Sequence, residues 1–475
     1  MKKYLLVIIL MVSVYAAKAQ GYNISLQSNY KSGIAYLTYY MGKDFILQDS
    51  SAVSNTGRSL FKSPKKLAPG IYSIIFPGKR LSTDFLIEKE QNISIVADTN
   101  KLAQTKITGS PANVDFKNYQ TFVNAKGKFL QQEKEAYNNS KTKTDSVKHE
   151  NAYKKLSKEL NDYRENVVKT KPNSMLAVLL NALREPSYPT KVAITRKDSI
   201  DNYNFYKSHY WDGISFMDDR IVRTPFFLPK LETYYRQIMP QASDSLIKDL
   251  DYKLLLARTS PEMYKFLLNW FTDEYINPKY MGQDAVFVHL YNKYHSKGVS
   301  NWLNKTQDSV ITRRAFMLMS NLIGEMAANL EFADTTGKTK ALYEVNSPYT
   351  VVIFWDPNCG HCKDEIPRLD SMYRASWQKK GVKIYAALSE GEKLKNEWLI
   401  FLREKKITDW VNVYQTKAMV DEETKNQRPT FRQLYNVEMT PTIYLLDKEK
   451  RIIAKKLTIE QMNDLIDVDM KKGNK

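Results

Sequence analysis

The sequence predicts a multidomain protein in which a β-sandwich-like N-terminal domain is followed by an α-helical middle domain and a C-terminal α/β domain. The chain has 475 residues, about three times the ~150 residues of an ordinary domain. Its apolar residues alternate with period two up to about residue 108, recur at helical spacing to about residue 321, and then form alternating strand and helix segments. Hydrophobic residues make up 43% and charged residues 26% of the chain, which excludes a disordered or collagen-like protein.

Residues 1–19 have the features of a secretory signal peptide. Two lysines precede an apolar run over 4–17, which is shorter than the ~20 residues of a membrane-spanning helix. Small residues at Ala17 and Ala19 then stand where a signal peptidase cleaves. We therefore expect cleavage after Ala19 and an exported, periplasmic protein.

The formal net charge of +19 raises the question of nucleic-acid binding. The lysines, however, are scattered among Glu and Asp along the expected helices, and an exported protein rarely meets nucleic acid. We interpret the charge as a solvated surface and expect no nucleic-acid partner.

The β-sandwich-like domain is expected over 20–109, because short alternating segments are separated there by turns containing Gly and Pro. Examples of the expected strands are 22–27, 34–40, 71–76, 85–87 and 93–96.

The helical domain is expected over 110–321. Phe116, Tyr119 and Phe122 are spaced for one face of its first helix, and we interpret the many aromatic residues of this region as core packing. Its histidines do not pair at metal-ligand spacing with another His or a Cys, so we interpret them as surface or hydrogen-bonded core residues: His149, His209, His289 and His295. No metal site is expected.

The α/β domain is expected over 322–475, with a central sheet and helices on both faces. It begins with a hairpin over 330–333 and 339–343. The remaining expected strands are 350–355, 382–388, 410–414, 442–446 and 451–457, the expected helices are 359–379, 393–405 and 459–470, and a charged, partly helical insertion precedes residue 437.

The two cysteines of the chain are Cys359 and Cys362, at the point where an apolar strand is expected to give way to a helix. So short a loop adds little as a structural staple, which favours a chemical role. The unpaired amides and the dipole of a helix start lower the pKa of a thiol, so we predict that Cys359 is the nucleophile. Cys362 lies one turn further on, where it can attack a mixed disulfide formed by Cys359. An imidazolium at His361 would favour the thiolate further.

These residues resemble the thioredoxin superfamily, in particular the exported thiol:disulfide oxidoreductases of the TlpA and ResA type. The resemblance covers roughly 325–475 and is carried by the run VVIFW over 351–355, Asp356-Pro357-Asn358, Cys359-Gly360-His361-Cys362-Lys363, Pro367 and Thr440-Pro441-Thr442. The helical region before it looks like an uncharacterised domain joined to such proteins, and that likeness transfers no activity.

The resemblance implies several roles. Pro441 matches the family's cis-proline, and Thr440 before it would offer backbone hydrogen bonds to a substrate strand. Trp355, which matches an earlier, buried Trp of the family, is grouped with them as a candidate substrate-binding residue. Glu365 matches an acidic residue kept near the sulfurs. No cofactor is expected.

Three departures from the family pattern bear on mechanism. Asn358 stands where the best-known member has a Trp, and Ile353 stands where a buried Asp usually helps to deprotonate the second Cys. Glu365 is therefore the candidate proton acceptor for Cys362, with a solvated helix position as the alternative. His361 replaces the Pro of strongly reducing thioredoxins, so the direction of electron flow stays open.

Other functions are weighed against thiol:disulfide exchange. A peroxidase needs a Thr or Ser one helical turn before its Cys, and residues 355–358 offer none. Two thiolates can hold Cu(I), whereas a closed zinc site needs two more ligands. A client-binding or chaperone-like protein with a docking thioredoxin-like domain is the remaining alternative. The expected partners are a protein thiol or disulfide substrate and a redox partner, which could be a membrane protein; both are unidentified, as is the oligomeric state.

Overall fold

The computed structural model describes residues 21–189 and 192–473, so the expected signal peptide lies outside the described residues. The described chain divides into two compact units, one made of residues up to 239 with 253–266, the other of 240–252 with the residues from 267 onward. The helical domain expected over 110–321 is thus shared between the two units. In the part of the chain that is described, no helix is both long enough and apolar enough to cross a bilayer.

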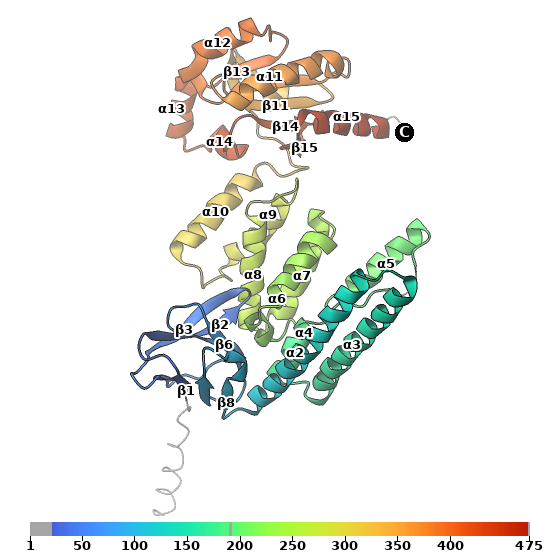
Figure 1. The fold of residues 1–475 in the computed structure, drawn as a ribbon. Helices are drawn as coiled ribbons and strands as arrows, with labels where there is room; N and C mark the ends of the chain where they lie inside the picture. Colours follow the sequence, from blue (N-terminus) through green and yellow to red (C-terminus); the bar gives the residue numbers. More distant parts are fainter. Residues whose placement is uncertain (1–20, 190–191, 474–475) are drawn as a thin grey trace, which may run out of the picture. The chain divides into compact units, whose positions relative to one another are not determined.

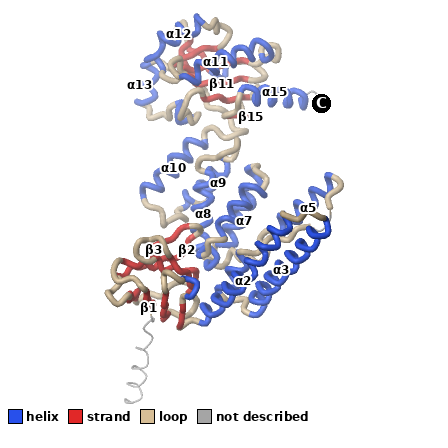
Figure 2. The backbone as a smooth tube through the Cα atoms, in the orientation of Figure 1, coloured by secondary structure: helices blue, strands red, loops and turns tan. Residues whose placement is uncertain are grey.

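The first unit begins with two four-stranded sheets, in the orders β4-β1-β7-β8 and β3-β2-β5-β6. Inward residues of both sheets, among them Ile24, Phe61, Ile74 and Phe85, form one buried core, as the β-sandwich-like prediction requires. The strands, red in Figure 2, are β1 (Tyr22–Ser28), β2 (Ile34–Met41), β3 (Asp44–Ala52), β4 (Arg58–Ser63), β5 (Gly70–Ile75), β6 (Ser82–Ile87), β7 (Asn92–Ala97) and β8 (Lys106–Thr108).

Helices complete the first unit. Two long antiparallel helices, α2 and α3, form a hairpin in which Phe122 stacks on Tyr163 with ring centroids 4.4 Å apart. The helical elements are α2 (Pro111–Asn138), α3 (Lys143–Thr170), α4 (Met175–Ala182), α5 (Arg196–His209), η3 (Asp219–Arg223) and α6 (Phe227–Thr233), and the helices α7 (Ser243–Ala257) and α8 (Pro261–Tyr275) contribute to both units (Figure 1).

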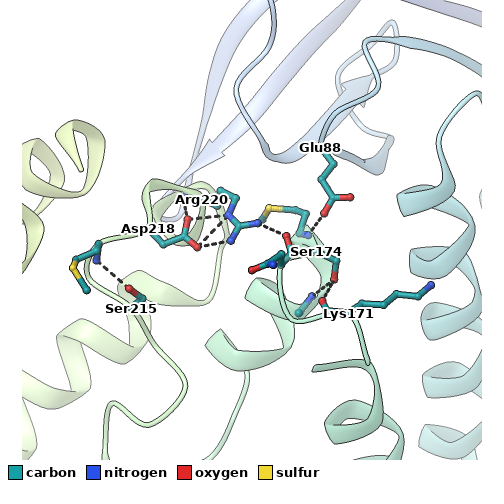
Figure 3. A network of polar contacts seen from close by, with 10 residues as sticks. Glu88, Lys171, Ser174, Ser215, Asp218 and Arg220 are labelled. Atoms are coloured by element: carbon teal, nitrogen blue, oxygen red, sulfur yellow. Dashed lines mark hydrogen bonds and ion pairs between the residues drawn. The ribbon is translucent and has the colours of Figure 1, made fainter. Parts of the chain in front are cut away.

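A polar network joins the β-sandwich to these helices inside the first unit (Figure 3). Glu88, which follows β6, accepts a hydrogen bond from the backbone amide of Met175 at the start of α4. Arg220 in η3 holds both carboxylate oxygens of Asp218 and donates to the carbonyl oxygen of Asn173 at 2.7 Å. These charge-assisted bonds fix the turn between α3 and α4 against the sandwich.

The second unit contains a seven-stranded sheet in the order β10-β9-β13-β12-β11-β14-β15. Strands β11, β12 and β13 are parallel, and β14 runs antiparallel to β11. The elements are α9 (Asp284–Lys293), α10 (Lys305–Met319), β9 (Glu331–Asp334), β10 (Thr339–Ala341), β11 (Thr350–Trp355), α11 (Gly360–Met372), β12 (Lys383–Leu388), α12 (Lys395–Glu404), β13 (Val411–Tyr414), α13 (Lys417–Lys425), α14 (Phe431–Leu434), β14 (Thr442–Leu446), β15 (Ile452–Lys455) and α15 (Ile459–Gly473).

Strand β11 is buried on both faces, which explains why every residue after Thr350 is apolar. Ile353 belongs to the core that includes Leu369 of α11 and Ile466 of α15. Phe354 belongs to the core on the opposite face, where it stacks on Phe431 of α14 at 5.4 Å. The predicted α/β arrangement with helices on both faces is confirmed.

Candidate active site

Cys359 lies at the N-cap of α11, directly beyond the end of β11. The backbone of Cys359 is extended (φ −72°, ψ 125°), and its carbonyl oxygen accepts the amide of Lys363 at 3.1 Å. The turn from strand to helix is fixed by Asp356, whose Oδ1 accepts the amide of Asn358 at 2.7 Å. The first amides of α11 therefore point toward the Cys359 sulfur, where they stabilise negative charge.

The two thiols, which are both free, have opposite surroundings. Burial alone would raise the pKa of Cys359, but hydrogen bonds from the Thr440 side chain and from the backbone amides of Cys362 and His361 outweigh it, so its pKa is lowered. Cys362 is fully buried, and burial raises its pKa to about 12. A partly exposed, acidic thiol beside a buried, basic one fits a nucleophile and a resolving cysteine.

Thr440 and Pro441 meet the sulfurs from the other side. The Thr440-Pro441 peptide is cis, and the Cys359 Sγ donates to the carbonyl oxygen of Thr440 at 3.3 Å. Thr442, the next residue, begins β14 and pairs with Phe354 of β11. Sheet register therefore brings Thr440 to the redox pair although 81 positions separate it from Cys359.

Residues 323–455 match the model of the AhpC/TSA family. The C-terminal domain is a thioredoxin-like domain of this family. Among curated proteins, the thiol-disulfide oxidoreductase ResA of Bacillus cereus is 25% identical over 135 residues, which are 28% of this chain and 68% of ResA. The general activity class of the thioredoxin-like domain is that of a thiol-disulfide oxidoreductase.

Solved structures also resemble parts of the chain. A domain of a possible thiol-disulfide isomerase from Cytophaga hutchinsonii is 37% identical and matches 32% of this chain and 97% of its own, with a TM-score of 0.28. A thioredoxin-like protein from Bacteroides caccae is 19% identical and matches 60% of this chain and 98% of its own, with a TM-score of 0.45.

The remaining predicted residues of the thioredoxin-like domain lie as follows. The His361 side chain is exposed, and the effect of His361 on Cys359 comes through its backbone amide, so a role for its imidazolium stays a prediction. Glu365 forms an ion pair with Arg368, which also contacts Glu460. No interaction described above links Glu365 to Cys362, so the acid–base role of Glu365 stays a prediction.

Trp355 requires a correction. Its side chain is completely buried, belongs to the core beneath α11 and packs on Phe401 with ring centroids 5.1 Å apart. A side chain without exposed surface cannot touch a protein substrate in this conformation, so Trp355 supports the strand that carries the site rather than binding substrate.

Two residues near the site, Asp356 and Met439, were given no role from the sequence. A backbone hydrogen bond with Asp356 favours the thiolate of Cys362. Met439, next to Thr440, is 73% exposed. Both could have been suspected from their positions beside the predicted motif, whereas their backbone geometry could not.

Two of the surface pockets lie at opposite ends of the strands β12 and β13. A pocket of about 590 Å³ opens beyond the carboxyl ends of β12 and β13 and is lined by Ser389 and Arg432. Ser389 donates its amide to the carbonyl oxygen of Trp355, so this pocket adjoins the strand end that leads to Cys359. A larger pocket, of about 820 Å³, includes Lys383 and Val411 at the opposite ends of β12 and β13, remote from the chemistry.

Among residues 21–189 and 192–473, no three His, Cys, Asp or Glu side chains converge as a metal site would require. The two thiols of the thioredoxin-like domain would have to hold Cu(I) by themselves, and this alternative stays a prediction.

Proposed function

We propose that the protein is an exported thiol:disulfide oxidoreductase that exchanges electrons with protein thiols and disulfides through Cys359 and Cys362. The observation that carries the proposal is the contrast between the two thiols. The pKa of Cys359 is lowered at the helix start beside Thr440, whereas the pKa of buried Cys362 is raised to about 12.

In the reducing direction, the Cys359 thiolate attacks one sulfur of a substrate disulfide. The substrate S–S bond breaks, a mixed disulfide forms with Cys359, and the first substrate thiolate leaves and takes up a proton. Cys362 then loses its proton and attacks the Cys359 sulfur of the mixed disulfide. This forms the Cys359–Cys362 disulfide and releases the second substrate thiolate, so the substrate gains two electrons from the pair.

The same steps run backwards when the oxidised pair meets a substrate dithiol. Continued turnover in the reducing direction needs a dithiol reductant, and in the oxidising direction it needs a disulfide oxidant. His361, which is exposed next to the nucleophile, is the residue from which we infer an oxidising rather than a strongly reducing poise.

Two features support a protein substrate. Thr440 is only partly buried beside Cys359, and exposed Met439 adjoins it, so an extended segment can reach the sulfur along the Thr440 backbone. Export is supported by the signal-like residues 1–19.

The test is capture of a substrate in the compartment proposed for the protein. Cys362→Ser lacks the resolving thiol, so the full chain should accumulate mixed disulfides through Cys359 in periplasmic extracts, separable on non-reducing gels. The matched control is the double variant Cys359→Ser/Cys362→Ser, which should accumulate none. Adducts that form equally in the double variant, or none in either, would contradict the proposal.

A further inference from the structure

The loop before Pro441 is held by helix α10, from the helical region of the second unit. We call residues 436–441 the cis-proline loop, since they end at the cis Thr440-Pro441 peptide. This loop connects α14 to β14. Its position decides where the Thr440 backbone stands relative to Cys359.

Arg314 on α10 makes the central contact. Its Nη1 donates to Asn436 Oδ1 at 2.8 Å and to Glu438 Oε1 at 2.7 Å. Its Nε donates to the carbonyl oxygen of Ile276 at 3.1 Å, which anchors the guanidinium to the end of α8. The Arg314 side chain is only 11% exposed, whereas that of Glu438 is 51% exposed. The guanidinium is therefore held by its three hydrogen bonds together rather than by the ion pair alone.

The start of the loop is held as well. Asn321, just beyond α10, donates to the carbonyl oxygen of Leu434 at 3.0 Å. Asn436 has a left-handed backbone (φ 45°) and is almost fully buried, and its side-chain oxygen accepts from Arg314. The side chains of Arg314 and Asn321 therefore form hydrogen bonds with three residues at or just before the start of the loop: Leu434, Asn436 and Glu438.

The last of these contacts, at Glu438, lies two residues before Thr440, which contacts Cys359. After Glu438 come exposed Met439 and then Thr440, whose carbonyl oxygen lies 3.3 Å from the Cys359 Sγ. In a loop released at Glu438, Met439 and Thr440 would be held only from the other end, where strand pairing begins at Thr442 and the Thr442 hydroxyl donates to the carbonyl oxygen of Met439 at 2.6 Å.

We propose that Arg314 is a positioning residue that aligns the cis-proline loop for protein substrates. Through it, the helical region sets where an extended substrate segment meets Thr440 and Met439. This inference rests on the proposed thiol:disulfide exchange and adds a residue outside the thioredoxin-like domain to it. Small disulfides need no backbone pairing, so a change in this alignment affects them only through the hydrogen bond of Thr440 to Cys359.

The test compares two disulfides in the full chain. Insulin is reduced with dithiothreitol as electron source, whereas the small aromatic disulfide dithionitrobenzoate, which dithiothreitol reduces directly, is added to protein that has first been reduced and freed of dithiothreitol. Arg314→Gln should raise the KM for insulin and lower its kcat/KM about tenfold, the size of effect expected for a lost charge-assisted bond. Its rate with dithionitrobenzoate should fall clearly less than kcat/KM for insulin, by at most the several-fold effect of the Thr440 hydrogen bond on Cys359. Arg314→Lys, which keeps the charge, should recover part of the loss.

Glu438→Ala removes the other partner, which is half-exposed, and therefore provides a variant that folds even where Arg314→Gln does not. It should lower kcat/KM for insulin several-fold, and the double variant should be no worse than Arg314→Gln alone. The control is Arg374→Gln, which breaks ion pairs of a more exposed arginine with Asp370 and Asp409 elsewhere in the domain and should change neither rate.

Equal losses with both disulfides, additive losses in the double variant, or an unchanged KM for insulin would overturn the positioning role. A wild type that reduces neither disulfide would instead contradict the proposed function, and this inference with it.

Discussion

The Sγ atom of Cys359 lies 3.3 Å from the carbonyl oxygen of Thr440, a residue 81 positions further along the chain. In the thiol form Cys359 donates to this oxygen. In the thiolate form the Thr440 side chain supplies a hydrogen bond that lowers the pKa of Cys359. Thr440 therefore contributes to the chemistry of Cys359 as well as lining the site.

Thr440→Val tests this contribution. The variant keeps the shape of the side chain but removes the hydroxyl, so the pKa of Cys359 should rise and less thiolate should be present at pH 7. We expect alkylation of Cys359 by iodoacetamide to slow several-fold at pH 7, the factor given by a hydrogen bond of about 1 kcal/mol. Thr424→Val, which removes a hydroxyl bound to Val420 on α13, should leave the rate unchanged; equal slowing in both variants would argue against Thr440.

The acid–base role of Glu365 is tested by the rate at which the protein releases substrate from the mixed disulfide. Because Glu365 is paired with Arg368, we expect Glu365→Gln to release substrate within about twofold of the wild-type rate. Single-turnover measurements with a preformed mixed disulfide give this rate, and Arg368→Gln is the control for the ion pair itself. A tenfold slowing confined to Glu365→Gln would restore the acid–base role inferred from the sequence.

The poise of the disulfide should depend on His361. For a C-G-H-C loop we expect a potential on the order of −180 mV, against about −270 mV for thioredoxin. His361→Pro should lower the potential, by at most ~60 mV because the exposed imidazole is screened by solvent. Equilibration of both proteins with glutathione measures the two reduction potentials. Equal potentials would show that His361 does not set the potential of the Cys359–Cys362 pair.

His295 predicts a pH dependence of stability. Burial lowers its pKa from 6.5 to about 4, only partly offset by the Asp308 charge. Between these values the unfolded chain binds a proton that the folded chain does not, so stability rises with pH in this window and is lost as pH falls from 6.5 toward 4. The loss is on the order of 3 kcal/mol at most.

The hydrogen bonds of His295 explain why it stays neutral. The Thr272 hydroxyl donates to Leu268 and so accepts from Nε2, which leaves Nδ1 to accept from Ser300. Urea unfolding at pH 7 and pH 5 should show a smaller acid loss for His295→Gln than for the wild type. An identical loss in both proteins would contradict this assignment.

The strands that carry the site could be predicted because buried strands consist largely of apolar residues. Residues 351–355 of β11 are all apolar since both faces of the strand are covered, and Cys359 follows after a turn of three residues. In contrast, β3 was missed because it is exposed along most of its length and shows no alternation. β4 and β8 were missed as well.

Long-range polar contacts could not be predicted. Arg314 and Glu438 are 124 positions apart, and each reads as an ordinary surface charge in its own segment. Glu365 is predicted from its spacing to lie near Cys362, and the structure adds an ion pair with Arg368 one turn later. Its acid–base role stays a prediction. Trp355 matches a family position that is itself buried, and its burial here agrees with that match but not with the substrate-binding role that was also expected.

The division of labour between the two thiols is tested most directly by the order in which they react. Reduced wild-type protein is treated with a limiting amount of iodoacetamide across a range of pH, and the labelled positions are identified by peptide mass spectrometry. The account predicts that Cys359 is labelled first, with a half-maximal rate at a pH below the ~8.5 of an ordinary cysteine, while Cys362 stays unlabelled at neutral pH. Faster labelling of Cys362 than of Cys359 would contradict it.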